Sequence, residues 1–256
     1  MLVDVHCHID AYPQAERELA ASEAAGVRTV AVTTSLASYV RTRLLCRHHP
    51  DVHVALGLHP RRVGAGYDQW DEWRQVLGGA SLVGEAGLDF RSGKQQDWAA
   101  QSEVLRTIAE ACGRDGRVLL LHSRYAEAEA WDIIVAAGVR WVVWHDYRPE
   151  GPKSLLYRTI EAGHMLAVGP EAAASPSIRA RLRAIPREQV LTETNGPWGC
   201  QGAGSRAVAL RGILAGLAEV WRCTPEEAEA QVERNFRRLL AEAAGERLVG
   251  QAFQPA

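Results

Sequence analysis

Short apolar runs alternate with longer amphipathic stretches over most of the chain. The expected strands cover residues 3–10, 28–33, 52–57, 81–85, 117–121, 141–144, 165–168 and 189–192. The first run alternates apolar and polar residues, which is the signal of a strand. The run at 117–121 is apolar almost throughout, which suits a strand buried on both faces of a parallel sheet.

Helix signals fill the intervals between these runs. The expected helices cover residues 14–25, 35–49, 67–77, 95–114, 125–137, 153–162 and 175–185, and two further helices close the chain. Gly26 and Gly138 each follow one of them, as glycines at helix ends commonly do. The last helix has an N-terminal capping pattern, with Thr224 as the cap, then a proline, and Glu227 three residues after the cap.

This alternation predicts parallel strands that are joined by helical crossovers. Eight such units within 256 residues favour an α/β fold of the TIM type, a (β/α)8 barrel, with two extra C-terminal helices. An open doubly wound sheet is disfavoured because the phosphate-binding glycine fingerprint is missing after the first strand. No linker, repeat or low-complexity tract divides the chain, so we expect one domain over residues 1–256.

Composition narrows the class of protein. The formal net charge is −2, so any contacts with nucleic acid would have to be local. The five cysteines are scattered and include no CxxC pair, which argues for a reducing compartment and against a zinc–thiolate site. Neither a basic-then-apolar leader nor an apolar run of membrane-spanning length is found, so we expect a cytoplasmic protein without membrane contact.

Two histidines in the first expected strand are candidate metal ligands. Side chains two residues apart on a strand point the same way, so Asp4, His6, His8 and Asp10 are expected along one face. The two imidazoles would stand roughly 7 Å apart along the strand and could bend toward one metal ion. The alternative is a strand that merely carries polar residues.

Further side chains with metal-binding chemistry recur where other strands end. In a (β/α)8 barrel the loops after the strands build the active site. The candidates at these positions are His6, His8, His59, Glu85, His122, Arg124, His145, Glu193 and Asn195. The remaining histidines, His48, His49, His53 and His164, fall in helix ends or strand bodies and are interpreted as structural or solvated. This sorting predicts a metal centre.

The types of ligand indicate the chemistry. Neutral imidazoles with a carboxylate suit one or two divalent ions of the zinc or manganese kind better than calcium; magnesium is a third candidate. Glu85 stands at the centre of the set and could bridge two ions. A divalent ion lowers the pKa of water and polarises carbonyl or phosphoryl oxygens, so metal-assisted hydrolysis is the predicted reaction class.

Six segments together resemble the TatD-type metal-dependent deoxyribonucleases of the amidohydrolase superfamily. They are residues 4–10 (DVHCHID), 57–60 (GLHP), 83–89 (VGEAGLD), 122–124 (HSR), 193–197 (ETNGP) and 235–239 (NFRRL). The resemblance spans roughly residues 3–240 and implies the eight-stranded barrel and a DNA substrate, single-stranded or at strand ends. It also implies the ligand sets: His6, His8 and Glu85 for one ion, and Glu85, His122 and His145 for a second. By the same resemblance, His59 and Arg124 contact substrate phosphate.

A narrower resemblance lies within the family. Residues 32–34 (VTT) and 55–60 (ALGLHP) look like the TatD-like component of Qat-type antiphage systems. This implies a role in antiviral defence and partner proteins of a defence complex.

Two segments depart from the family pattern. Asn195 stands where the family has an aspartate that binds metal and serves as a base for the attacking water. An amide keeps an acceptor oxygen but carries no charge and takes no proton. The loop after His145 also differs, reading DYRPEG in place of the family's CFSG. Three explanations stay open: the ion alone suffices, Glu193 or Asp146 substitutes as base, or the site is weakened.

The leading hypothesis is a metal-dependent DNase whose candidate catalytic residues are Glu85, Glu193 and Asn195. One alternative is an amidohydrolase-type enzyme that acts on a small amide, ester or lactone, since a fold does not fix a function. Another is a catalytically weakened subunit that binds metal and nucleic acid within a larger complex.

Residues around the expected mouth of the barrel have two interpretations. A basic rim of Arg61, Arg62, Arg91, Lys94, Arg148 and Lys153 would bind phosphates, although charged loop residues are often only solvated. Trp198 follows the last strand and could stack on a base. Cys7 is expected to face away from the adjacent histidines as a small core residue.

Overall fold

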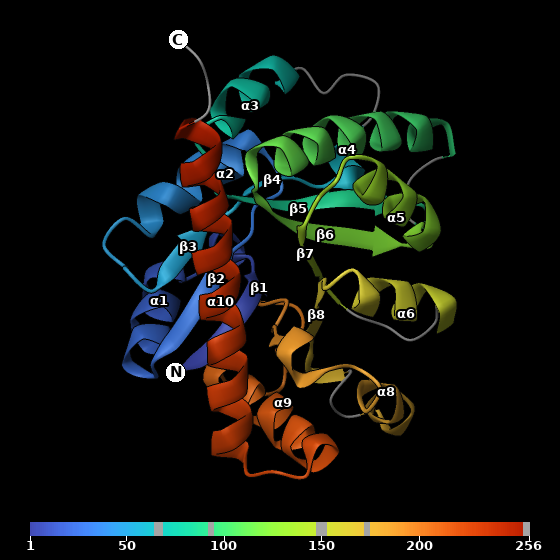
Figure 1. Ribbon diagram of the computed structural model, residues 1–256. Coiled ribbons are helices and arrows are strands. Elements are labelled where there is room, and N and C mark those ends of the chain that lie inside the picture. Colours follow the sequence, from blue (N-terminus) through green and yellow to red (C-terminus); the bar gives the residue numbers. More distant parts are fainter. Residues whose placement is uncertain (64–68, 92–94, 147–152, 172–174, 253–256) are drawn as a thin grey trace.

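The computed structural model describes residues 1–63, 69–91, 95–146, 153–171 and 175–252, in which helices surround a central set of strands (Figure 1). The strands are β1 (Leu2–Cys7), β2 (Val27–Ala31), β3 (Val52–Val54), β4 (Leu56–Leu58), β5 (Leu82–Asp89), β6 (Val118–Arg124), β7 (Trp141–Trp144), β8 (Met165–Val168) and β9 (Val190–Thr192). β1 to β3 form one sheet and β4 to β9 a second. All neighbouring strands are parallel and follow chain order, as the alternation predicts.

The strand expected at residues 52–57 is divided at Ala55 into β3 and β4. The chain therefore passes from the first sheet to the second within one short segment. Beside this junction the backbone of β5 bonds directly to the segment after β2: the Glu85 N–H donates to the carbonyl oxygen of Thr33, at 3.0 Å. The division replaces one predicted strand by two, and the order of the strands around the barrel is unchanged.

The first and last strands meet at a second junction. The Asn195 N–H donates to the carbonyl oxygen of His6 (2.9 Å), and the His8 N–H donates to that of Gly196 (2.8 Å). A parallel bridge pairs Cys7 with Gly196 at the same place. The hydrogen-bonded ladder is interrupted at both junctions, yet the strands follow the TIM-type order, and that fold class is confirmed.

The helices are α1 (Ala15–Ala24), α2 (Leu36–Leu45), α3 (Trp70–Leu77), α4 (Gln95–Asp115), α5 (Glu127–Ala136), α6 (Lys153–Glu161), α8 (Pro176–Leu182), α9 (Arg206–Trp221) and α10 (Pro225–Ala252). The last of them packs against α9, β1 and β9 (Figure 1). Its predicted cap is present, because Glu227 N–H donates to Thr224 Oγ1 (3.2 Å) and Thr224 N–H to Glu227 Oε2 (2.8 Å). Among the described residues, no helix combines the length and apolar character that crossing a bilayer requires.

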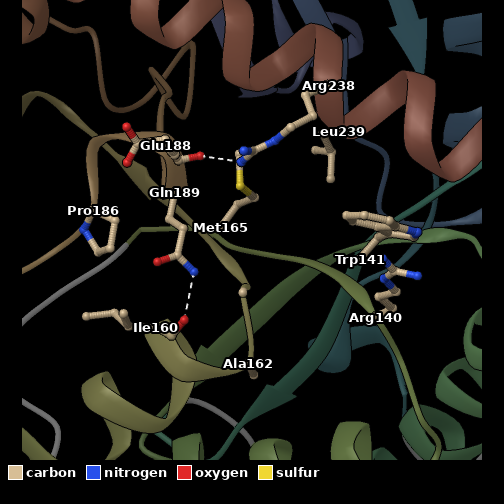
Figure 2. Close-up of a pocket in the computed structure, with 11 residues that line it drawn as sticks. Arg140, Trp141, Ile160, Ala162, Met165, Pro186, Glu188, Gln189, Arg238 and Leu239 are labelled. Carbon is tan, nitrogen blue, oxygen red and sulfur yellow. Dashed lines mark hydrogen bonds between the residues drawn. The ribbon is translucent and has the colours of Figure 1, made fainter.

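A cavity of about 420 Å³ lies at the amino ends of β7 and β8 (Figure 2). Gln189 joins two segments there, since its Nε2 donates to the carbonyl oxygens of Ile160 (2.9 Å) and His164 (3.1 Å). Arg238 of α10 donates to the carbonyl oxygen of Glu188 (2.7 Å). The lining includes no histidine or cysteine among the residues that the structure describes. This end of the barrel supplies packing and backbone contacts, while the five histidines predicted as site residues lie at the carboxyl ends of the strands.

Candidate active site

Five histidines converge on one glutamate at the carboxyl ends of the strands. Glu85 lies within β5 and its side chain is almost fully buried. His6 lies in β1 and His122 in β6, while His8, His59 and His145 directly follow β1, β4 and β7. Because parallel strands end at one edge, residues that are up to 139 positions apart in the sequence meet at one point.

Each oxygen of the Glu85 carboxylate faces its own set of imidazoles. On one side, Oε2 lies 3.4 Å from His8 Nε2 and 3.6 Å from His6 Nε2. On the other side, Oε1 lies 2.6 Å from His122 Nδ1, 3.0 Å from His145 Nε2 and 3.5 Å from His59 Nε2. The first set is one ligand group that the family resemblance implies, and the second contains the histidines of the other group together with His59.

Several polar atoms of this cluster are buried without a hydrogen-bond partner in the described chain. Both ring nitrogens of His6 are in this state, and so are His145 Nδ1 and Glu193 Oε2. A buried imidazole that makes no hydrogen bond at either nitrogen is unfavourable. A divalent cation would satisfy such nitrogens, so the residues present fit a metal centre.

Three groups of side chains bring their ligand atoms within 4.8 Å of one another. They are His6, His8 and Glu85; His59, Glu85 and His122; and His6, His145 and Glu193. The first group is one of the two predicted ligand sets. The other two groups add His59, a predicted contact to substrate phosphate, and Glu193, a candidate catalytic residue.

His59 is better suited to donate a hydrogen bond than to bind metal. The backbone N–H of Arg61 donates to His59 Nδ1 (3.1 Å), so this nitrogen carries no proton. Burial, together with the neighbouring His122 and His145, lowers the pKa of His59 to about 4, which keeps the ring neutral. A neutral ring then carries its proton on Nε2, the nitrogen that faces the cluster.

The charges of the cluster are strongly coupled. Burial would raise the pKa of Glu85, but the surrounding imidazoles, led by His6, hold this pKa well below its usual range. Burial lowers the pKa of His6 and of His8. Burial opposes protonation of His122 too, yet Glu85 and Asp89 raise its pKa to about 9. Glu85 and Asp89 thus favour a positive charge beside them, and a bound cation would supply one.

Glu193 and Asp146 lie on the β7 and β9 side of the cluster. Glu193 Oε2 is 3.9 Å from His145 Nδ1, and Glu193 Oε1 accepts a hydrogen bond from the Asp146 N–H (2.6 Å). Burial and the nearby Asp146 carboxylate raise the pKa of Glu193 well above its ordinary value. Asp146 and Asn195 both adopt left-handed backbone conformations, with φ of 47° and 48°, which Asp and Asn tolerate better than most residues.

A cavity of about 610 Å³ opens over the cluster. Its lining includes Asp146 and Asn195, the arginines Arg61, Arg62 and Arg124, and Trp198. Arg61 is held by the buried Asp89, to whose Oδ2 its Nε donates at 2.8 Å. Two members of the predicted basic rim, Arg61 and Arg62, therefore line the cavity, and Arg124, a separately predicted phosphate contact, lines it with them.

Other members of that rim have different positions. Arg91 follows β5, and its guanidinium lies 5.7 Å from the ring centre of Tyr125. Lys94 and Arg148 lie outside the described residues, and Lys153 begins α6. Cys7 is a buried core residue that packs with Ile9, Leu19 and Ala31, as expected.

The expectation that Asp4 and Asp10 share a face with the histidines is wrong. The register of β1 against β2 shifts between Asp4 and Cys7, which breaks the simple alternation. Asp4 accepts hydrogen bonds from Arg206, on α9, through the guanidinium Nε (3.0 Å) and Nη2 (2.9 Å). Asp10 instead accepts a hydrogen bond from Arg41 (2.6 Å) in a 3-10 turn after the strand.

Sequence reasoning missed two charged residues that support the site. Asp89 has no exposed surface, binds Arg61 and lies 3.6 Å from His122 Nε2. Arg206 is buried in α9 and binds Asp4. Both lie in sequence contexts that also suit an exposed charge, so only tertiary packing reveals them.

Comparison with known proteins supplies the family context for this geometry. The family model described as "TatD related DNase" matches residues 3–241. A metal-dependent hydrolase of Mycobacterium tuberculosis, TatD, is 25% identical over 93% of this chain and 97% of its own length. The crystal structure of the Escherichia coli TatD homologue YjjV superimposes with a TM-score of 0.81 at 25% identity, covering 93% of this chain and 97% of that one.

Proposed function

Because the chain belongs to the TatD-related DNase family of metal-dependent hydrolases, we propose that it hydrolyses phosphodiester bonds in single-stranded DNA or at strand ends. The observation that carries this proposal is the convergence of five imidazoles on Glu85 beneath a cavity that three arginines line. Imidazoles with a carboxylate suit a divalent metal, and guanidinium groups suit phosphate. Side chains suited to hold a metal and side chains suited to bind phosphate thus lie at one cavity.

We assign one ion to His6, His8 and Glu85 and a second to Glu85, His122 and His145. Asn195 lines the same cavity and offers a further oxygen ligand. Zinc, manganese and magnesium are the candidates. When bound, such an ion supplies a Lewis acid that activates water and stabilises charge on the phosphoryl oxygens.

Arg124 and His59 hold the scissile phosphate in this proposal. Arg124 lies at the end of β6 and lines the cavity, and a guanidinium binds phosphate through two parallel hydrogen bonds. His59 donates from Nε2, because its Nδ1 already accepts from Arg61. Together they orient the phosphate over Glu85.

The proton of the attacking water needs an acceptor other than Asn195. Of the two carboxylates that could substitute, Asp146 lines the cavity, whereas Glu193 is buried and lies behind His145. We therefore assign proton acceptance to Asp146. Glu193 becomes a positioning residue, because its Oε1 accepts from the Asp146 N–H (2.6 Å) and holds the segment that carries Asp146.

Metal removal and reconstitution test the proposed function. Chelation is expected to abolish cleavage of an end-labelled single strand, and zinc, manganese or magnesium, added separately, is expected to restore it. Elemental analysis of the protein as purified identifies the ion that it holds. Persistent cleavage in metal-free protein would refute the proposal. Turnover of small esters, amides or lactones without any cleavage of DNA would favour the amidohydrolase alternative.

The Asn195→Asp substitution is expected to raise kcat/KM for DNA about a hundredfold, the lower end of what a general base contributes. Aspartate tolerates the left-handed backbone at this position and can take a proton. In the unchanged protein Asp146→Asn should cost about the same factor, but it should matter little in the Asn195→Asp background. The rate of single-turnover cleavage is compared among the unchanged protein, the two single variants and the double variant. No gain from Asn195→Asp would show that the amide is tolerated and that the site is not weakened.

We further propose that the protein acts with partner proteins in antiphage defence. The support for this is the resemblance of residues 32–34 and 55–60 to the TatD-like component of Qat-type systems. Co-purification of the full chain with the products of its neighbouring genes tests the assembly, and a phage-plating assay with a Glu85 variant tests the role. Normal protection by that variant would contradict the role.

A further inference from the structure

Two strongly exposed aromatic side chains stand beside the arginines of the active-site cavity. Trp198 is 56% exposed and lines the cavity itself. Tyr125 is 63% exposed and directly follows Arg124, which also lines the cavity. We infer that Trp198 and Tyr125 are stacking platforms for unpaired bases, and that through them the site prefers single-stranded to duplex DNA. The inference rests on the proposed phosphodiesterase function, which it makes more specific.

Trp198 lies beside His8 of the histidine cluster and belongs to a closely packed turn. Its ring centre lies 5.0 Å from that of His8, at an interplanar angle of 63°. The Gly199 N–H donates to the carbonyl oxygen of Asn195 (3.0 Å), and a Cβ at Gly199 would lie only 2.2 Å from the carbonyl oxygen of Thr194. The backbone that carries Trp198 is thus constrained, so less freedom is lost when a base stacks on its ring.

Tyr125 occupies a backbone conformation that its side chain does not favour. Its φ is +58°, in the left-handed region where a bulky residue is strained and a glycine is not. The turn itself therefore gives no reason for an aromatic ring. The Arg91 guanidinium lies 5.7 Å from the ring centre and adds a positive charge next to this exposed surface.

The charges of the active-site cavity suit a nucleic acid backbone. Arg61, Arg62 and Arg124 line the cavity, together with the carboxylates of Glu85 and Asp146. The imidazoles enclose the Glu85 carboxylate, and the guanidinium groups are the side chains of this lining that suit phosphate. Inside a duplex the bases stack on each other and offer no free face, whereas unpaired bases can stack on protein aromatic rings. Aromatic platforms therefore add affinity for single strands, while the arginines add affinity for both forms.

Binding of fluorescent DNA under chelation tests the inference, because no turnover intervenes. The probes are an oligo(dT) strand and a blunt duplex, compared at one fixed salt concentration by fluorescence anisotropy. Trp198→Ala and Tyr125→Ala are each expected to raise Kd for oligo(dT) about tenfold and to change Kd for the duplex much less. Trp198→Phe and Tyr125→Phe keep a ring and should largely preserve single-strand binding.

Two further variants serve as matched controls. Tyr157→Ala removes an equally exposed tyrosine from α6, outside the cavity lining, and should change neither Kd. Arg62→Ala removes a charge instead of a ring and should weaken both forms by a similar factor. If Trp198→Ala and Tyr125→Ala weaken the binding of both DNA forms by the same factor, or weaken neither, the inference is overturned. The proposed function would not be affected by either result. Failure of the unchanged protein to bind either form would count against the proposed function itself.

Discussion

The Glu85→Gln substitution is expected to lower DNA cleavage by about a thousandfold, the loss that follows removal of a key electrostatic group. Glutamine has nearly the same shape as glutamate but lacks the negative charge. Glu85 is the carboxylate that all five imidazoles face, at distances between 2.6 and 3.6 Å. Without it the two ligand sets lose the group that joins them, so metal content by elemental analysis should fall along with cleavage of an end-labelled strand.

Glu129→Gln is the matched control for this loss. Glu129 lies in α5, is partly buried and accepts a hydrogen bond from Ser102, and it does not line the cavity. Its replacement should leave metal content and cleavage close to those of the unchanged protein. Thermal unfolding under chelation shows whether Glu85→Gln is folded, because both proteins are then compared without metal. Full activity of Glu85→Gln after chelation and reloading would contradict the assignment of Glu85 as the bridging ligand.

Most of the barrel could be predicted because its strands and helices differ locally in hydrophobic period. The helix limits agree to within a few residues for α4 and α5, where apolar residues recur at helical spacing. The division of the third strand into β3 and β4 could not be predicted, since residues 52–57 read as one continuous strand. The length of β5, which runs on to Asp89, depends on its pairing with β6 as far as Arg124. The pairing of strands that are distant in the sequence depends on the tertiary structure, so the end of β5 could not be predicted from its own residues.

The candidate ligand histidines could be located because closure of a barrel brings all strand ends to one mouth. His6, His8, His122 and His145 lie around Glu85, as the position of each after or within its strand suggests. The roles of individual nitrogens could not be inferred in this way. The proton position on His59, for example, follows from a hydrogen bond that Arg61 donates in the turn after β4.

The expectation for Asp4 was wrong because strand alternation assumes a regular strand. The irregularity in β1 turns Asp4 toward Arg206, which has almost no exposed surface. Arg206 also donates to Ser22 Oγ (3.0 Å) and to Thr29 Oγ1 (2.6 Å), and so joins α9 to α1 and β2. A pattern of apolar and polar residues does not reveal a buried charged pair of this kind, since Asp4 is expected beside the histidines of its strand and an arginine such as Arg206 is usually exposed.

This buried pair gives the largest expected effect on stability. Arg206→Met is expected to lower the free energy of unfolding by about 3–5 kcal/mol, because it leaves the Asp4 carboxylate buried without its counter-charge. Asp4 also accepts hydrogen bonds from Thr194 N–H (2.9 Å) and Oγ1 (2.6 Å), just before Asn195, and from the His6 N–H (3.3 Å). Loss of the pair should therefore loosen the junction of β1 and β9 that carries two of the site residues.

Urea denaturation measures this cost, and two variants make it specific. Arg237→Met removes an arginine that pairs with Glu233 on the surface, with the arginine side chain 59% exposed, and should cost at most about 1 kcal/mol. Asp4→Asn combined with Arg206→Met removes both charges of the pair and should be more stable than Arg206→Met alone. If Arg206→Met costs no more than Arg237→Met, the Asp4–Arg206 pair does not stabilise the junction. Since that junction positions His6 and Asn195, the metal affinity of Arg206→Met under native conditions should fall with its stability and recover in part in the double variant.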